Sequence, residues 1–171
     1  AFMEQTAVEA TMGANKSDIV FQDCAVCPEM TVIPAGSFIM GSDGRHKYER
    51  PSRQVTITRP FAMGVYEVTF DEWQACFNDG GCTHVPDDHN WGKGRRPVMN
   101  ITWFDTQTYL TWLSKKTGHN YRLPTEAEWE KAACWNEETQ RKSVFPWGNE
   151  SPGTNHANLL ESYLWNCTVS R

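Results

Sequence analysis

Short alternating and apolar runs in the first half of the chain predict β-strands rather than long helices. In residues 54–58, Val55 and Ile57 alternate with polar neighbours, which is the pattern of a half-buried strand. Two apolar runs flank the turn residues Pro34-Ala35-Gly36 and predict a strand, a turn and a second strand. The extended segments expected from these runs are 30–33, 37–40, 54–58 and 61–68.

Three N-terminal helix signatures follow, each with a threonine at the cap and an acidic residue three positions later. The pairs are Thr69 and Glu72, Thr102 and Asp105, and Thr125 and Glu128. The first predicted helix ends near residue 77, and the second ends at Gly118, which suits a C-terminal cap. The apolar residues expected on the buried sides of the second and third helices are Tyr109, Leu110, Trp112 and Leu113, then Trp129, Ala132 and Ala133.

These elements predict the α+β class, with short strands, two or three short helices and about half irregular structure. A further short strand is expected at 121–123, and the loops at 42–53, 83–97 and beyond 136 are polar or rich in Gly and Pro. Residues 1–28 have no sustained period, so we expect an N-terminal arm or linker there. One loop-rich domain is expected over 29–171.

Composition and charge exclude several classes of protein. With 39% apolar and 22% charged residues, the 171-residue chain has the balance of a globular domain that can bury a core. Its net charge of −5 and the lack of a basic stripe give no reason to expect a nucleic-acid partner. No apolar run approaches the roughly 18 residues of a membrane span. The N-terminus shows no signal-peptide pattern, so such a segment is either absent or already removed.

Four of the six cysteines form two close pairs along the chain. Cys76 and Cys82 flank Phe-Asn-Asp-Gly-Gly, whose turn chemistry lets the two ends meet, which favours a disulfide over two free buried thiols. Cys24 and Cys27 have the spacing of a disulfide, a redox pair or half a zinc site. Their position before Pro28, in a linker, favours the disulfide. The pairs indicate a periplasmic or secreted protein.

The segment 84–89 contains two imidazoles and two carboxylates. His84 and His89, with Asp87 and Asp88, have the donor types of a metal site. The Pro and Asn around them are typical of an exposed turn, in which Asp and Asn side chains bind neighbouring backbone N–H groups. The turn is the favoured interpretation, and the metal site is the alternative.

Five motifs in order carry a resemblance to a known family. They are Val-Ile-Pro-Ala-Gly-Ser-Phe-Ile-Met-Gly at 32–41, Tyr-Glu-Val-Thr at 66–69 with Trp73, Pro-Val-Met-Asn-Ile-Thr-Trp at 97–103, Arg-Leu-Pro-Thr-Glu-Ala-Glu-Trp-Glu at 122–130 and Phe-Pro-Trp-Gly-Asn at 145–149. From about residue 30 to residue 158 the chain resembles the formylglycine-generating-enzyme, or sulfatase-modifying-factor, superfamily. The resemblance implies a variant of the C-type-lectin-like fold.

The same resemblance implies a second half that this sequence does not show. In the family that half carries a Gly-Asn-x-Trp-Glu-Trp segment, an Arg-Gly-Gly-Ser-x motif, two copper-ligating cysteines and a closing Gly-Phe-Arg strand. The family's oxidases use copper and oxygen to convert a substrate cysteine to formylglycine, and soft thiolate ligands suit copper(I). We therefore expect an incomplete domain of this oxidoreductase family, without the copper cysteines and with no assignable catalytic or cofactor-binding residue.

Two interpretations of the missing half stay open. The remainder of the domain could be a separate partner of this chain, or the fold could serve without the chemistry. The alternative function is a non-catalytic C-type-lectin-like binding or structural module. Such a module would contact a protein or peptide through the loops at 42–53 and 83–96.

The resemblance also implies a calcium site and a cysteine bridge. In the family, the segment after the Pro-Trp-Gly turn supplies a side-chain oxygen and a carbonyl to calcium, and these correspond to Asn158 and Leu159. The remaining ligands lie in an Asp-x-aromatic segment that this chain does not show. Cys134 lies where the family often bridges to the second half. Cys167 is its candidate partner, and an unpaired thiol is the alternative.

Overall fold

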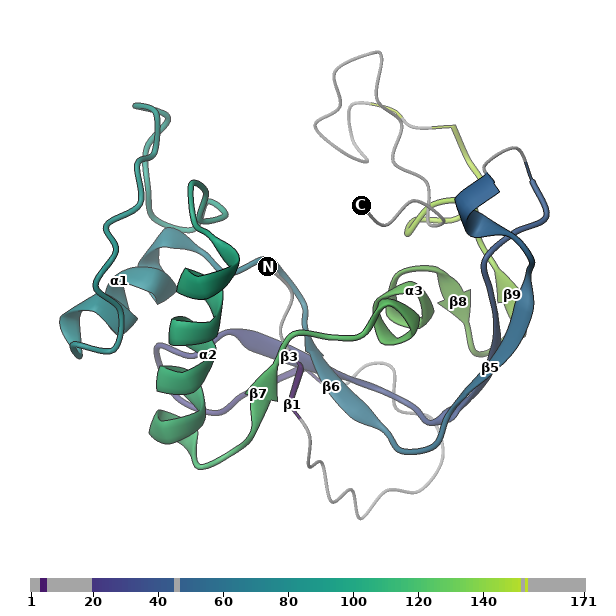
Figure 1. Ribbon diagram of the computed structural model, residues 1–171, viewed down its shortest axis with the longest axis horizontal. Coiled ribbons are helices and arrows are strands. Elements are labelled where there is room, and N and C mark those ends of the chain that lie inside the picture. The colour runs from purple at the N-terminus through teal and green to yellow at the C-terminus, as the bar shows by residue number, and fades with distance from the viewer. Residues whose placement is uncertain (1–3, 6–19, 45–46, 152, 154–171) are drawn as a thin grey trace. The chain divides into compact units, whose positions relative to one another are not determined.

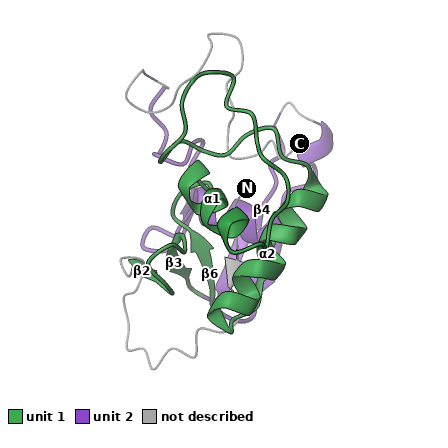
Figure 2. Ribbon diagram, turned by 90° about the vertical axis from the view of Figure 1, so that its left-hand side faces the viewer, with its two compact units in different colours: residues 1–34, 60–124 green, residues 35–59, 125–171 purple. Residues whose placement is uncertain are grey.

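Two compact units make up the structure, and their segments alternate along the chain. The computed structural model describes residues 4–5, 20–44, 47–151 and 153. The first unit comprises residues 1–34 and 60–124, and the second comprises residues 35–59 and 125–171 (Figure 2). The chain therefore passes between the units three times, and a proline lies at each passage: Pro34, Pro60 and Pro124.

A five-stranded antiparallel sheet lies in the first unit, in the order β2-β3-β6-β1-β7. Its strands are β1 (Glu4–Gln5), β2 (Val20–Gln22), β3 (Glu29–Ile33), β6 (Phe61–Gly64) and β7 (Tyr121–Arg122). Figure 1 labels four of these strands: β1, β3, β6 and β7. The central strand β6 is buried at every position and pairs with β3, from Met30 opposite Gly64 to Ile33 opposite Phe61. As a strand it ends at Gly64, whereas the expected extended run continued to residue 68.

Residues 1–28, expected to form an arm or linker, contribute two strands to this sheet. β1 pairs with both β6 and β7, and β2 pairs with β3. The predicted strands at 30–33 and 37–40 both exist, but they do not pair with each other. The reason is that β3 pairs with β6 in the first unit, whereas the chain enters the second unit after Pro34, where its next strand has a different partner.

The two helices of the first unit begin at the predicted threonine caps. α1 spans Phe70–Asn78 and α2 spans Trp103–Thr117. In both capping boxes the threonine hydroxyl accepts from the third helical amide, and the acidic side chain at that position accepts from the cap amide. α2 ends at Gly118 with a φ of 77°, a left-handed conformation that glycine adopts without a side-chain clash. None of the described helices is long and apolar enough to cross a membrane.

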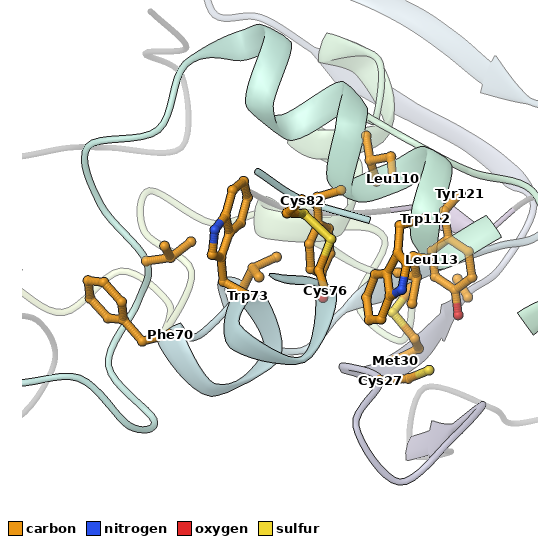
Figure 3. Close-up of a cluster of buried hydrophobic side chains, with 14 residues drawn as sticks. Cys27, Met30, Phe70, Trp73, Cys76, Cys82, Leu110, Trp112, Leu113 and Tyr121 are labelled. Carbon is orange, nitrogen blue, oxygen red and sulfur yellow. A yellow bond between two sulfur atoms is a disulfide. The ribbon is translucent and has the colours of Figure 1, made fainter. Parts of the chain in front are cut away.

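Aromatic packing between α1 and α2 forms the core of the first unit (Figure 3). Trp73 and Tyr109 stack with ring centroids 5.5 Å apart and planes 8° from parallel, and the Trp112 ring lies 5.3 Å from that of Tyr109. The other buried members of this core are Cys27, Met30, Ala62, Val68, Phe70, Cys76, Cys82, Val98, Leu110, Leu113 and Tyr121. The four residues expected on the buried side of α2 are thus confirmed.

The second unit combines a β-hairpin with a short helix. β4 (Gly36–Met40) and β5 (Arg53–Ile57) form an antiparallel pair, and the loop between them contains the 3-10 helix η1 (Lys47–Glu49). α3 (Glu126–Cys134) begins at the third predicted capping box and contacts β4. It leads into a small hairpin of β8 (Trp135–Asn136) and β9 (Arg141–Lys142). Phe38 of β4 packs edge-on against Trp135, with ring centroids 6.2 Å apart.

The buried face of α3 is mainly charged, which corrects the expectation for this helix. The expected residues Trp129, Ala132 and Ala133 are only half-buried. The buried residues are Glu128, Glu130, Lys131 and Cys134. Glu130 Oε1 accepts from the Gly41 amide at 2.7 Å and pairs with Lys142. Lys131 is 1% exposed and pairs with Glu137 at 2.8 Å. Charges are tolerated inside a protein when they are paired and hydrogen-bonded in this way.

Gly81→Ala is expected to destabilise the first unit. A Cβ at residue 81 would lie 2.3 Å from Trp112 Cδ1, so the packed indole would have to move. Overpacking of this kind costs about 1–3 kcal/mol, which urea unfolding of the variant would measure. The matched control is Gly44→Ala, whose new Cβ would meet only the Ser42 hydroxyl, at 3.2 Å. Equal stability of G81A and the unaltered chain would contradict this packing.

Candidate functional site

The described cysteines are all disulfide-bonded. Both predicted disulfides are present. The Cα–Cα distance is 5.0 Å in Cys24–Cys27 and 5.3 Å in Cys76–Cys82. Cys134 is disulfide-bonded as well, which removes the alternative of an unpaired thiol, while its candidate partner Cys167 lies outside the described residues. A disulfide sulfur is not a thiolate, so no described cysteine offers the ligand that zinc or copper(I) binds.

One asparagine side chain holds the long loop at 83–102 together. Asn100 Nδ2 donates to the Asp87 carbonyl at 2.7 Å and to His89 Nε2 at 3.1 Å. His84 Nε2 in turn donates to the Asn100 carbonyl at 2.9 Å. Asn100 has a φ of 57°, a left-handed conformation that asparagine tolerates better than most residues. The loop is therefore closed on itself through Asn100.

Both ends of this loop are also attached to α1. Trp73 Nε1 donates to the His84 carbonyl at 3.0 Å where the loop begins. On the return, the first two amides of α1 donate to the carbonyls of Arg96 and Gly94, at 2.9 Å and 3.1 Å. The first amides of a helix have no partner inside the helix, so the loop supplies the acceptors. Figure 1 shows the loop in teal, extending above α1 and α2.

The candidate metal ligands of this loop make the turn contacts that the sequence favoured. Asp87 Oδ1 accepts from the His89 amide and Asp88 Oδ2 from the Gly92 amide, both at 2.9 Å. The exposed side chains of His89 and Asp87 lie 3.5 Å apart. Within the described part of the chain, no group of three or more His, Cys, Asp or Glu could hold a metal ion. The geometry thus supports the turn.

An open groove of about 630 Å³ lies beside α2, within the first unit. Its lining residues are Asp79, Gly80, Gly81, Phe104, Gln107, Thr108, Thr111, Trp112 and Lys115. The Phe104 ring is 75% exposed and packs edge-on against the exposed Trp103, with centroids 5.3 Å apart. The hydroxyls of Thr108 and Thr111 donate to helix carbonyls four residues earlier, so these donors are already engaged. The groove therefore combines a phenyl ring, polar side chains and the ammonium group of Lys115.

Asp79, which lines the groove, accepts hydrogen bonds from two side chains of α2. Its carboxylate accepts from Lys116 Nζ at 2.6 Å and from Trp112 Nε1 at 3.1 Å. Two hydrogen bonds hold the pKa of the Asp79 carboxyl below its usual value. The bond from Lys116 has the larger effect, and the bond from Trp112 adds to it. The carboxylate is therefore ionised at neutral pH and balances the charge of Lys116.

Two buried tyrosines give further polar groups, Tyr109 from the predicted buried side of α2 and Tyr121 from the predicted short strand. The Tyr109 hydroxyl has no hydrogen-bond partner among the described residues, and burial, then the nearby Glu72, raises its pKa. The Tyr121 hydroxyl donates to Asp23, and burial together with this bond raises its pKa. Both phenols are protonated at neutral pH. An aromatic residue in an apolar helical pattern gives no sequence signal for an unpaired hydroxyl.

The calcium candidates Asn158 and Leu159 lie outside the described residues, so that site stays a prediction. The aromatic turn that precedes them is described. Phe145 and Trp147 stack with centroids 5.1 Å apart, and the backbones of Phe145 and Gly148 exchange two hydrogen bonds of 2.9 Å. The Val144 amide donates to Asn149 Oδ1 at 2.9 Å. The Phe-Pro-Trp-Gly-Asn motif therefore forms a closed turn.

Comparison with known proteins matches most of the chain to one family. Residues 16–170 match the family described as sulfatase-modifying factor enzyme 1-like domain. Among solved structures, the one titled "Structure of PvdO from Pseudomonas aeruginosa" is 40% identical in sequence, with a TM-score of 0.62. The similarity covers 70% of this chain and 52% of that chain.

Curated relatives cover similar parts of the sequence. Hercynine oxygenase from Mycobacterium tuberculosis is 29% identical, over 71% of this chain and 36% of the relative. Formylglycine-generating enzyme from Mus musculus is 28% identical, over 78% and 46%. Inactive C-alpha-formylglycine-generating enzyme 2 from Mus musculus is 31% identical, over 78% and 55%. The matches therefore span between about a third and just over half of the length of these relatives.

Asn100→Ala is expected to loosen the loop at 83–102. The variant loses both side-chain hydrogen bonds and places a Cβ without polar compensation at a left-handed φ, which together cost about 1–2 kcal/mol. Amide hydrogen exchange of residues 87–92 should rise. Asn90→Ala is the matched control, because its φ is 62° but its side chain makes no hydrogen bond within the described chain. Equal exchange in both variants would contradict the role of Asn100.

Asp79→Asn is expected to lower stability at neutral pH and to have less effect in acid. The folded-state pKa of Asp79 is lowered, so its contribution is present above the unfolded pKa of about 3.9 and is lost as pH falls through the folded value. Urea unfolding at pH 7, 5 and 3 would measure the difference between D79N and the unaltered chain. If the difference in free energy of unfolding between D79N and the unaltered chain stayed constant down to pH 3, the Asp79 carboxylate could not be the cause of that difference.

Proposed function

The chain belongs to the sulfatase-modifying factor enzyme 1-like family, and from this membership we propose that it forms part of a formylglycine-generating-enzyme-like domain. The reaction class is the copper- and oxygen-dependent oxidation of a substrate cysteine to formylglycine. The observation that carries the proposal is the family match over residues 16–170. Relatives named as formylglycine-generating enzyme and as hercynine oxygenase support an oxidative function for the whole domain.

The described residues do not fit a copper site. Copper(I) binds thiolates, whereas every described cysteine is in a disulfide. We therefore derive no catalytic step through copper from these residues. In this proposal the copper cysteines belong to the remainder of the domain, which is consistent with the partial coverage of the longer relatives. In that domain, this chain would contribute the aromatic core of the first unit, the aromatic turn at 145–149 and the loop at 83–102.

The finer fold that we propose is the C-type-lectin-like variant of this family. The mixed helix-and-strand structure and its similarity to PvdO support this assignment. We propose a periplasmic or secreted location, because disulfides persist in oxidising compartments. Calcium bound by the Asn158 side-chain oxygen and the Leu159 carbonyl is part of the same proposal, with further oxygen ligands from outside this sequence.

A non-catalytic binding module is the second candidate function. It is favoured by the relative named inactive C-alpha-formylglycine-generating enzyme 2, which is 31% identical over 78% of this chain. It is also favoured by the loop at 83–102, whose shape is held by hydrogen bonds to α1 and through Asn100. A rigid, exposed loop can recognise a protein or peptide without any redox chemistry.

Oxygen uptake with a Cys-x-Pro-x-Arg peptide and copper distinguishes the two candidates. We expect no peptide-dependent uptake by the 171-residue chain alone, because its described cysteines are in disulfides. We expect uptake by a longer product of the same gene that carries an additional cysteine pair. The aldehyde product can be trapped with a hydrazide and identified by mass spectrometry.

The matched control is the same longer product with both additional cysteines replaced by serine, which should bind no copper and take up no oxygen. Copper-dependent aldehyde formation by the 171-residue chain would contradict the assignment of the copper cysteines. Absence of uptake by the copper-loaded longer product would remove the oxidase function and leave the binding module.

A further inference from the structure

The loop at 83–102 carries an exposed surface to which the proposed oxidase function assigns no ligand. This surface is formed by the segment 91–96, which we call the tip. Trp91 is 64% exposed, and the cationic side chains of the tip are also exposed: Lys93, Arg95 and Arg96. Tryptophan and arginine are the residues that most often dominate the energy of protein–protein contacts.

The two arginines of the tip are not engaged in ion pairs within the described chain. Asp87 and Asp88 belong to the same loop, and their carboxylates accept backbone N–H bonds of the loop. No described acidic side chain forms an ion pair with Arg95 or Arg96. Lys93 lies over the Phe70 ring, with its Nζ 5.8 Å from the centroid. A negatively charged partner would therefore complete the electrostatics of this surface.

The backbone of the tip is held before any partner binds. His89 and Asn90, directly before the tip, have φ angles of 50° and 62°, a left-handed conformation that histidine and asparagine adopt more readily than most residues. The ring of His89 packs edge-on against Trp91, with centroids 5.9 Å apart. Within the tip, the carbonyls of Gly94 and Arg96 accept hydrogen bonds from the first two amides of α1. A surface ordered in advance loses less conformational entropy on binding.

We propose that the tip is a docking surface for an acidic protein segment that also presents an apolar side chain to Trp91. The guanidinium groups of Arg95 and Arg96 would bind carboxylates, and the exposed indole would pack against the apolar group. An acidic peptide fits better than a nucleic acid. The chain carries a net charge of −5, so a long polyanion would be repelled by the rest of the surface, whereas a short acidic segment contacts the tip alone.

Fluorescence anisotropy with a defined probe tests the proposal on the whole chain. The probe is the fluorescein-labelled peptide Glu-Asp-Leu-Glu-Glu-Phe-Asp-Glu at roughly physiological ionic strength. Trp91→Ala should weaken binding about tenfold or more, and the double variant R95E/R96E should weaken it by at least as much. The peptide with Gln and Asn in place of its acidic residues should bind about tenfold more weakly than the probe.

Two control variants separate the tip from general surface effects. Tyr48→Ala removes an aromatic side chain that is 89% exposed in the second unit. The double variant R59E/R141E makes the same charge change as R95E/R96E at exposed positions outside the tip. Both should bind the probe within about twofold of the unaltered chain. The altered side chains in all four variants are exposed, so the melting temperature should be nearly unchanged and folding can be checked directly.

Three results would overturn the proposal. The first is equal affinity of W91A, R95E/R96E and the unaltered chain for the acidic peptide. The second is equal binding of the neutral peptide. The third is tighter binding of an eight-nucleotide oligothymidine than of the acidic peptide, which would assign the tip to nucleic acid. None of these measurements depends on copper or oxygen, so they stand apart from the test of the oxidase function.

Discussion

The indole of Trp73 joins the core of the first unit to the loop that the core carries. Its ring stacks on Tyr109, and its N–H donates to the His84 carbonyl at 3.0 Å. A buried indole N–H without an acceptor would cost free energy, so the packing of the ring and the path of the loop are determined together. The stacking of α1 on α2 and the start of the loop thus depend on the same side chain. The exposed loop therefore begins at a residue that is bound directly to the hydrophobic core.

The disulfides of the described cysteines contribute to stability and leave no thiolate for metal binding. A disulfide restricts the unfolded chain and leaves no thiolate to bind a soft metal. The cysteine sulfur atoms of the described part are thus committed to cross-links. The proposed copper(I) chemistry would need thiolates from elsewhere, whereas the proposed recognition through the loop at 83–102 would use residues that are already in position.

The sequence predicted features that depend on neighbouring residues and missed those that depend on distant ones. All three capping boxes and Gly118 follow from contacts within one helical turn, and they were predicted correctly. The pairing of β3 with β6 was not predicted, because strands separated by a second unit leave no local signal. Glu130 was missed as a buried residue because the Gly41 amide that it binds lies 89 positions away. Asn100 belonged to a recognised motif, but its left-handed φ is visible only in the structure.

The alternation of the two units along the chain has a consequence for synthesis on the ribosome. Both segments of the first unit have emerged once residue 124 has left the exit tunnel, so that unit can close early. The β4–β5 hairpin emerges before most of that unit, yet Gly41, directly after β4, has its hydrogen-bond partners in Glu130 and Lys142. During synthesis the hairpin therefore stays incompletely packed until Glu130 and Lys142 have left the exit tunnel. At Pro34 and Pro124 the chain passes from the unit that can close early to the other unit, and at Pro60 it passes back. Neither unit can be obtained as a single continuous fragment.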